Sequence, residues 1–248
     1  MDFAKITAEY YSKWIGKDNI LLDMGSGVEY IFSPERNLVQ PGYSRQFDLF
    51  IFRQPDKLII SYGDKLRNRI DLFKSDMVTK AEPNDVIEMF GQRLGATVNH
   101  GIKYLYTAIP DKELQAVYLT KSDYPKYLTF FLANNPGCKN TEWLEEYFTE
   151  MTNKNLCCGI YVNNTLVCCS DAPDMPYMKN DVQEIGINTL KAYRGLGYAT
   201  DVCIAAVKII IKNNKCPQWP TTATNVASQK LAEKIGFIKY ADYYTVTL

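Results

Sequence analysis

The chain has 248 residues, of which 46% are hydrophobic and 23% charged, a composition typical of one large or two small globular domains with a true core. Lysine plus arginine and aspartate plus glutamate both number 28, and this zero net charge argues against binding to nucleic acid or to an anionic membrane. No apolar run has the length of a membrane span, no signal peptide is recognisable, and the seven cysteines form no secreted-type framework, so we expect a cytoplasmic protein.

The first part of the chain is predicted to be an α+β domain, which we assign to residues 1–112. Apolar residues at helical spacing, from Phe3 to Trp14, predict a helix over 3–15. β-Branched and aromatic runs separated by turn residues predict strands at 28–32, 47–52 and 57–62. Two helices at 64–73 and 83–94 and a strand at 97–109 are expected to follow.

The second part, residues 113–248, is predicted to be a mixed α/β domain. Its expected strands lie at 114–120, in a hairpin at 156–169, and at 181–189, 219–224 and 237–248. Its expected helices lie at 121–134, 141–153, 198–214 and 225–235. This order of elements indicates one ordinary domain with helices packed on a sheet.

The cysteine-rich segment "LCCGIYVNNTLVCC" is predicted to be a hairpin that turns at Asn163-Asn164. A two-residue turn would place Cys158 opposite Cys169, and Gly159 opposite Cys168. Adjacent cysteines on a strand point to opposite faces, so four sulfurs cannot converge on one zinc ion. We interpret them as small buried side chains, with a 158–169 disulfide as the alternative. The single histidine, His100, excludes sites that need several histidines, and we interpret it as structural.

Two segments contain glycines at a spacing suited to a cofactor. "ILLDMGSGVEY" at 20–30 resembles the cofactor loop of S-adenosylmethionine-dependent methyltransferases, but a strand-like run follows it where a helix is needed. "YRGLGYAT" at 193–200 has the required context, a predicted strand before it and a long helix after it. Helix N-termini expose N–H groups, Gly195 and Gly197 allow close approach, and Arg194 adds a cation, as a pyrophosphate requires. The alternative is a glycine turn that only starts the helix.

Residues 194–199 of this segment fit the Arg-x-x-Gly-x-Gly/Ala signature of the GNAT acetyltransferases. "NVASQKLAEKIGF" at 225–237 is similar to their second signature, an Asn-led helix that ends in Glu-Lys-x-Gly-Phe. The resemblance covers roughly residues 113–248, and it narrows to bacterial two-domain members of the zwittermicin-resistance type. It implies a central mixed, mostly antiparallel sheet flanked by helices.

The resemblance also implies a reaction and its cofactor. Acetyl-CoA is expected as co-substrate, without a metal, and its acetyl group would pass to a primary amine of a small molecule by direct attack in a ternary complex. The pyrophosphate would lie on the N–H groups of residues 195–199, and the pantetheine arm on the exposed backbone of 187–189. The expected cofactor-binding residues are Ile187, Asn188, Thr189, Arg194, Gly195, Leu196, Gly197, Tyr198, Ala199, Thr200 and Asn225.

The catalytic residues are less completely specified. Glu184 occupies the strand on which the family often carries its general base, although a solvated glutamate is the alternative. The family's acid, a tyrosine seven residues after the asparagine, corresponds here to Ala232. Ser228, another tyrosine, water or no acid at all could replace it, so an acyl-CoA sensor with little turnover is an alternative function, and a methyltransferase is a second one. The N-terminal domain is expected to complete the acceptor pocket, and a homodimer is compatible with this view.

Overall fold

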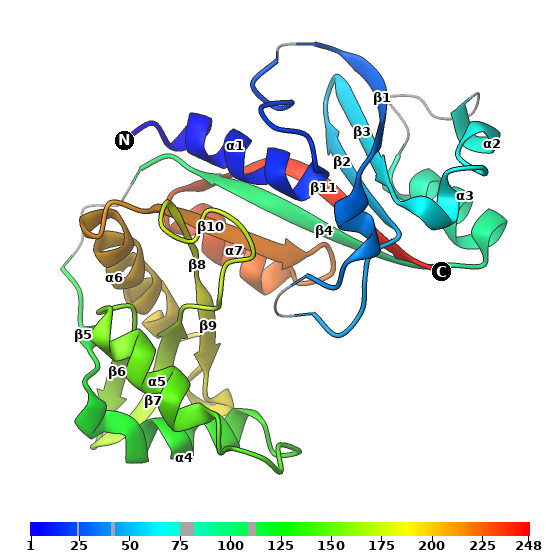
Figure 1. The fold of residues 1–248 in the computed structure, drawn as a ribbon. Coiled ribbons are helices and arrows are strands. Elements are labelled where there is room, and N and C mark those ends of the chain that lie inside the picture. The colour runs from blue at the N-terminus through cyan, green and yellow to red at the C-terminus, as the bar shows by residue number, and fades with distance from the viewer. Residues whose placement is uncertain (24, 41–42, 75–81, 109–112) are drawn as a thin grey trace.

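The computed structural model describes residues 1–23, 25–40, 43–74, 82–108 and 113–248 (Figure 1). Its helices are α1 Phe3–Ile15, α2 Asp71–Lys74, α3 Pro83–Leu94, α4 Tyr124–Asn134, α5 Leu144–Asn153, α6 Tyr198–Lys212 and α7 Val226–Lys234, with 3-10 helices η1 Pro34–Asn37, η2 Asp64–Leu66, η3 Lys121–Asp123 and η4 Lys191–Tyr193. Its strands are β1 Gly27–Phe32, β2 Leu49–Gln54, β3 Lys57–Tyr62, β4 Thr97–Tyr106, β5 Val117–Tyr118, β6 Cys158–Val162, β7 Thr165–Asp171, β8 Val182–Glu184, β9 Gly186–Thr189, β10 Cys216–Thr222 and β11 Phe237–Thr247.

Within the described residues the strands form two sheets. The larger has the order β1-β3-β2-β11-β4-β10-β8, and the smaller has the order β5-β6-β7-β9. The pairs β1–β3 and β8–β10 are parallel, and the other pairs in both sheets are antiparallel. The expected mixed α/β fold with a mostly antiparallel sheet is therefore confirmed.

The larger sheet joins the two parts of the chain. The C-terminal strand β11 pairs with β4 on one side and with β2 on the other, so strands from before and after the expected boundary alternate. The boundary itself falls at residues 109–112, which lie outside the described residues, and the division into 1–112 and 113–248 stays a prediction. Because the two parts share one sheet, the N-terminal part can supply side chains to a site built on β8 or β10.

Helices cover both faces of the sheets. Helix α6 packs on β6, β7 and β10 and shares a core with α7, into which Ile102, Tyr104 and Tyr106 of β4 point. Helix α1 packs on the opposite face, against β2, β3 and the start of β10. Because side chains alternate along a strand, the intervening Lys103 points toward α1. In Figure 1 α1 lies across the larger sheet, above β4 and β10.

Helix α1 has strong local start and stop signals. The Asp2 side chain accepts a hydrogen bond from the Lys5 N–H, and Gly16 ends the helix in the left-handed conformation with φ of 85°. A Cβ at Gly16 would overlap the Ser33 side chain, so glycine is required both for the backbone angle and for space. These signals fix the length of the helix that carries Tyr10 and Tyr11 toward the sheet.

The hairpin turns at Asn163 and Asn164 as predicted, both with positive φ, but the register of its far end was predicted wrongly. A bulge adds Val167 to β7, so Gly159 lies opposite Cys169, and Cys158 lies opposite Ser170. Cys158 faces α6, whereas Cys169 faces α4 and α5, which rules out the 158–169 disulfide. All seven cysteines are free.

The remaining differences concern short elements. The helix expected at 64–73 is divided into η2 and α2, and the strand expected at 114–120 is reduced to β5. The strand expected at 181–189 changes partners midway and becomes β8 and β9. The His100 Nε2–H donates a hydrogen bond to the Asp242 carboxylate at 2.9 Å, and the ring stacks on Tyr244, in keeping with its structural interpretation. No helix in the described ranges is both long and apolar enough to cross a membrane.

Candidate functional site

The two sheets separate between β9 and β10. Strand β8 pairs with β10 as far as Glu184 and Gln218, and the Ile185 N–H makes a last bond to the Gln218 carbonyl. From Gly186 onward the chain pairs with β7 on its other side. The edge of β9 that faces β10 therefore has no strand partner among the described residues. Such an edge offers backbone donors and acceptors to an extended ligand, which is the role expected of residues 187–189.

The loop after β9 is shaped by two glycines. Gly195 and Gly197 have φ of 80° and 86°, and a Cβ at either would meet no atom within 4 Å. Glycine is thus needed here for the backbone conformation and not for space. Gly197 is the N-cap of α6, and its carbonyl accepts from the Thr200 N–H. None of the N–H groups of residues 195–199 has an acceptor in the described part of the chain.

Arg194 ties this loop to the preceding strand. Its Nε donates to the Thr189 carbonyl at 3.1 Å, while the rest of the guanidinium lies at the exposed surface. The free N–H groups, the positive end of α6 and this arginine converge on one place. Together they form the arrangement that binds a phosphate or pyrophosphate.

A groove of about 550 Å³ extends from β9 across the loop to α7. It contains each of the eleven expected cofactor-binding residues except Leu196, whose side chain is 61% exposed. On the α7 side of the groove the sequence had indicated Asn225 and Ser228. Lys230 and Lys234 were missed, although their i, i+4 spacing on the helix that follows Asn225 was available as a signal. The lining contains three basic residues and no acidic one. The full lining comprises Ile187, Asn188, Thr189, Tyr193, Arg194, Gly195, Gly197, Tyr198, Ala199, Thr200, Asn225, Ala227, Ser228, Lys230, Leu231 and Lys234.

Asn225 and Ser228 organise the start of α7. The Asn225 side chain caps the helix by accepting from the Ser228 N–H at 3.1 Å. The Ser228 hydroxyl oxygen accepts from the indole N–H of the buried Trp219 at 3.1 Å, which leaves its own hydrogen available to a ligand in the groove. Ala232 is fully buried in the core shared with α6.

Glu184 lies at the closed end of the gap between the sheets, outside the groove itself. It is half-buried and faces α1, where the Tyr10 hydroxyl donates to its Oε1 at 3.3 Å. Burial raises the pKa of Glu184, and the charge of Lys103 opposes that rise only in part. A carboxylate with a raised pKa at the end of β8, just before the strand β9 that enters the glycine loop, is suited to act as a general base.

Lys103 was not anticipated from the sequence. It is 2% exposed, and its ammonium lies 4.2 Å from the ring centre of Tyr243, 5.1 Å from that of Tyr11 and 5.4 Å from that of Trp14. Burial lowers its pKa to about 8, while Glu184 acts in the opposite sense. The signal in the sequence was a lysine in the middle of an otherwise apolar strand, "GIKYLY".

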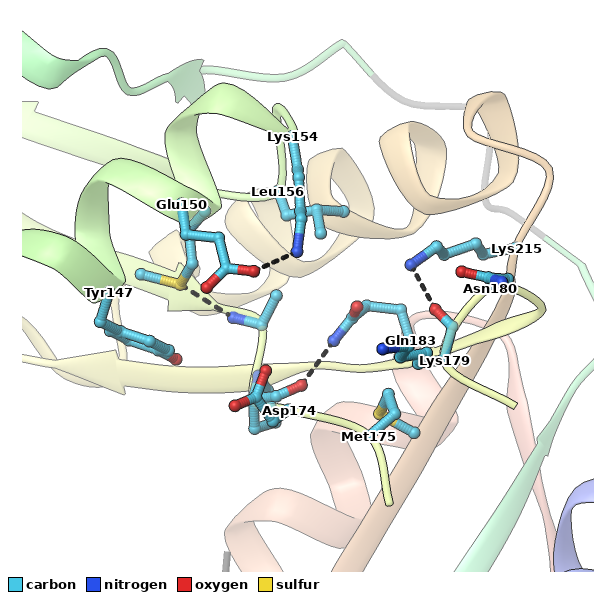
Figure 2. A pocket seen from close by; sticks show the side chains of 13 residues that line it. Tyr147, Glu150, Lys154, Leu156, Asp174, Met175, Lys179, Asn180, Gln183 and Lys215 are labelled. Carbon is cyan, nitrogen blue, oxygen red and sulfur yellow. Dashed lines mark hydrogen bonds and ion pairs between the residues drawn. The ribbon is translucent and has the colours of Figure 1, made fainter. Parts of the chain in front are cut away.

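A second hollow, of about 500 Å³, lies between α5 and the segment that joins β7 to β8 (Figure 2). Figure 2 shows that polar side chains of this hollow interact with other groups of the protein: Lys154 forms an ion pair with Glu150, and the Lys215 ammonium donates a hydrogen bond to the Lys179 carbonyl at 2.7 Å. Charges of both signs and internal bonding distinguish this hollow from the positively charged groove.

The chain is similar to known acetyltransferases. Residues 132–246 match the family GNAT acetyltransferase. Among solved structures, it is similar to an acetyltransferase of the GNAT family from Colwellia psychrerythraea, with 19% identity over 61% of this chain and 57% of that one and a TM-score of 0.53. It is also similar to a GCN5-related N-acetyltransferase from Sphaerobacter thermophilus, with 12% identity over 67% of this chain, 57% of that one and a TM-score of 0.54.

These likenesses have clear bounds. The aligned part spans little more than half of each of the two solved chains, and at these identities the likeness concerns the fold. No curated protein sequence matches the chain. The narrower resemblance to zwittermicin-resistance-type enzymes stays a prediction. Residues 132–246 match the GNAT acetyltransferase family, and the fold of the chain agrees with that match.

Proposed function

We propose that the chain transfers an acetyl group from acetyl-CoA to a primary amine of a small molecule, by direct attack in a ternary complex. The observation that carries the proposal is the run of five free backbone N–H groups at residues 195–199, in a groove with three basic residues and no acidic one. This donor set fits a pyrophosphate. The unpaired edge of β9 fits the amide-bearing arm that joins the pyrophosphate to the thioester.

In this proposal Glu184 removes the proton from the attacking amine. The amine nitrogen forms a bond to the acetyl carbonyl carbon, the bond from that carbon to the CoA sulfur breaks, and the departing thiolate takes up a proton. Ser228 is the candidate donor of that proton, because the Trp219 indole N–H bonds to its oxygen and leaves the hydroxyl hydrogen free. Tyr10, which donates to Glu184, would hold the carboxylate in place.

The proposal is tested by calorimetric titration with acetyl-CoA, followed by an acceptor screen that records thiol release and identifies products by mass spectrometry. We expect micromolar binding and release of thiol with at least one amine. Absence of binding at millimolar acetyl-CoA would overturn the proposal.

A second candidate function is an acyl-CoA sensor with little turnover, which the buried Ala232 favours because the family's acid is missing there. The sensor predicts acetyl-CoA binding without thiol release for every amine in the screen. The methyltransferase alternative has less support, since Gly27 leads directly into strand β1 and no helix N-terminus follows that loop.

A further inference from the structure

Two lysines are buried in the described part of the chain, and their ammonium groups differ in partners. Lys57 Nζ donates to the Ile20 carbonyl at 2.8 Å and to the Asp23 carbonyl at 3.4 Å. Lys103 Nζ has no hydrogen-bond acceptor and no carboxylate within 4.0 Å among the described residues, and the rings of Tyr11, Trp14 and Tyr243 lie around it. A buried ammonium without acceptors is costly, so this position calls for an explanation.

The aromatic surroundings of Lys103 are specifically built. Tyr243 on β11 lies directly opposite Gly101 on β4, and a Cβ at Gly101 would overlap the Tyr243 ring. Glycine in the middle of a strand is unfavourable, and here it allows the ring to lie flat over the sheet beside the ammonium. Tyr11 and Trp14 of α1 close the other sides. We call Lys103, Tyr11, Trp14 and Tyr243 the lysine cage.

Cation–π contacts favour the charged form of Lys103, but ring faces are poor substitutes for the oxygen acceptors that its three N–H donors require. The lysine cage borders the candidate base. The Tyr10 hydroxyl bonds to Glu184, and the Tyr10 ring centre lies 5.0 Å from that of Tyr11, a member of the cage; the charges of Glu184 and Lys103 interact. The cluster reaches the surface, since Glu184 is half-buried and the neighbouring Tyr43 is 46% exposed. A ligand that reaches Glu184 thus comes close to an ammonium that lacks an acceptor.

The charge on this face is specific. Glu184 is negative and Lys103 is positive. The other buried cation near α1, Arg36, donates through Nη2 to the Trp14 carbonyl and lies over the Phe50 ring, while its Nε and Nη1 have no hydrogen-bond partner among the described residues. A purely cationic acceptor such as a polyamine would be repelled by Lys103. The single charge of the Lys103 ammonium matches a single negative charge on a ligand.

We propose that the acceptor is a zwitterion, an amine that also carries a carboxylate, whose amino group meets Glu184 and whose carboxylate meets the Lys103 ammonium. The inference rests on the proposed function, because it assigns the substrate class of that same site. It makes Lys103 a specificity-determining residue, and it places an amino acid or a related amine among the substrates.

The test compares amines that differ only in the carboxylate: L-phenylalanine with phenethylamine, L-leucine with isoamylamine, and L-lysine with cadaverine. Acetyl transfer is followed as thiol release. For the wild type we expect kcat/KM to favour the carboxylated member of at least one pair by roughly ten- to a hundredfold, the range of a charge-assisted hydrogen bond. In Lys103→Met this ratio should fall to near one. The control Lys57→Met changes the buried lysine that already has acceptors, and the ratio should persist.

Equal rates for both members of each pair, a preference for the members without carboxylate, or an unchanged ratio in Lys103→Met would overturn the inference. Failure of the proposed function is recognised separately, as absence of transfer to any amine. In that case calorimetry with N-acetyl-L-phenylalanine and N-acetylphenethylamine on the wild type decides the inference. Tighter binding of the carboxylated probe supports it, and equal or weaker binding of that probe overturns it.

Discussion

The groove between β9 and α7 and the lysine cage present positive charge in two different ways. The groove has its donors on the backbone, at the first turn of α6, and its lysines on α7. The cage holds one buried side-chain cation among rings from α1 and β11. The groove therefore depends on backbone angles and tolerates most side-chain changes, whereas the cage depends on burial and on the charges beside it. This difference predicts which substitutions each region can accept.

The largest effect is expected from Glu184→Gln, beside the cage. Removal of a general base should lower kcat by roughly a hundred- to ten-thousandfold while acetyl-CoA affinity is kept. Because burial raises the pKa of Glu184, the wild-type rate should fall with acid at a pH above the usual glutamate range, and the variant should lose this limb. Glu29→Gln, on the distant β1, is the control. A normal kcat in Glu184→Gln would show that Glu184 is not the general base and has only a structural role.

The groove is most sensitive at Gly197. Replacement by valine leaves the side chain in open space but imposes a φ of 86° that a β-branched residue does not tolerate, so the N–H groups of the loop should be displaced. We expect acetyl-CoA affinity to fall by at least about a hundredfold in calorimetry, since two or more phosphate bonds are lost.

Gly27→Val is the matched control for that loss. Gly27 also has positive φ, at 105°, with open space at the Cβ position, but it is the first residue of β1, away from the groove. It should lower stability to a similar extent and leave acetyl-CoA affinity unchanged. Equal losses of affinity in both variants would mean that strain in general, and not the groove loop, is responsible.

The two regions also differ in how far the sequence revealed them. The β9 and loop side of the groove is encoded in consecutive residues, a strand, two glycines and a helix start, so local chemistry was enough to predict that these residues lie together, whereas Lys230 and Lys234 on the α7 side were not predicted. Leu196 was the exception, because the sequence does not say which way a loop side chain points. The lysine cage brings together residues from α1, β4 and β11, which only the fold makes neighbours.

The fold shows the same pattern. Elements with strong periodicity or caps, such as α1 and α6, were predicted close to their ends. The bulge at Val167 was not predicted, because a single extra residue in one strand does not change the pattern of a short run that is apolar at every position. The position of β11 between β2 and β4 could not be predicted from the sequence either, because it depends on pairing between residues far apart along the chain.

The titration of Lys103 should make the free energy of unfolding depend on pH. Its pKa falls from 10.5 to about 8 in the folded protein, so between these pH values the unfolded chain binds more protons than the folded chain. The free energy of unfolding should therefore rise with pH in this window, by on the order of 3 kcal/mol at most. The neighbouring Tyr11 and Tyr243 have raised pKa values and stay neutral there.

Lys103→Met removes this titration. The variant should be more stable than the wild type at pH 7, and the difference should shrink as the pH approaches 10.5, in urea unfolding followed by tryptophan fluorescence. Lys57→Met provides the contrast, because that lysine has carbonyl acceptors and its loss should destabilise the protein. A Lys103→Met variant that is less stable at pH 7 would show that the ammonium is already satisfied.

The smallest effect is expected at Ser228, where the groove meets the core. Ser228→Ala leaves the buried Trp219 indole N–H without its acceptor, so the free energy of unfolding should fall by about 1–2 kcal/mol. If the hydroxyl also protonates the thiolate, kcat should fall by roughly tenfold without a change in acetyl-CoA affinity. Ser228→Thr keeps a hydroxyl at this position and should recover most of both losses. A Ser228→Ala variant with reduced stability but full kcat would assign the serine to the support of Trp219 alone, and would leave water as the proton donor in this groove.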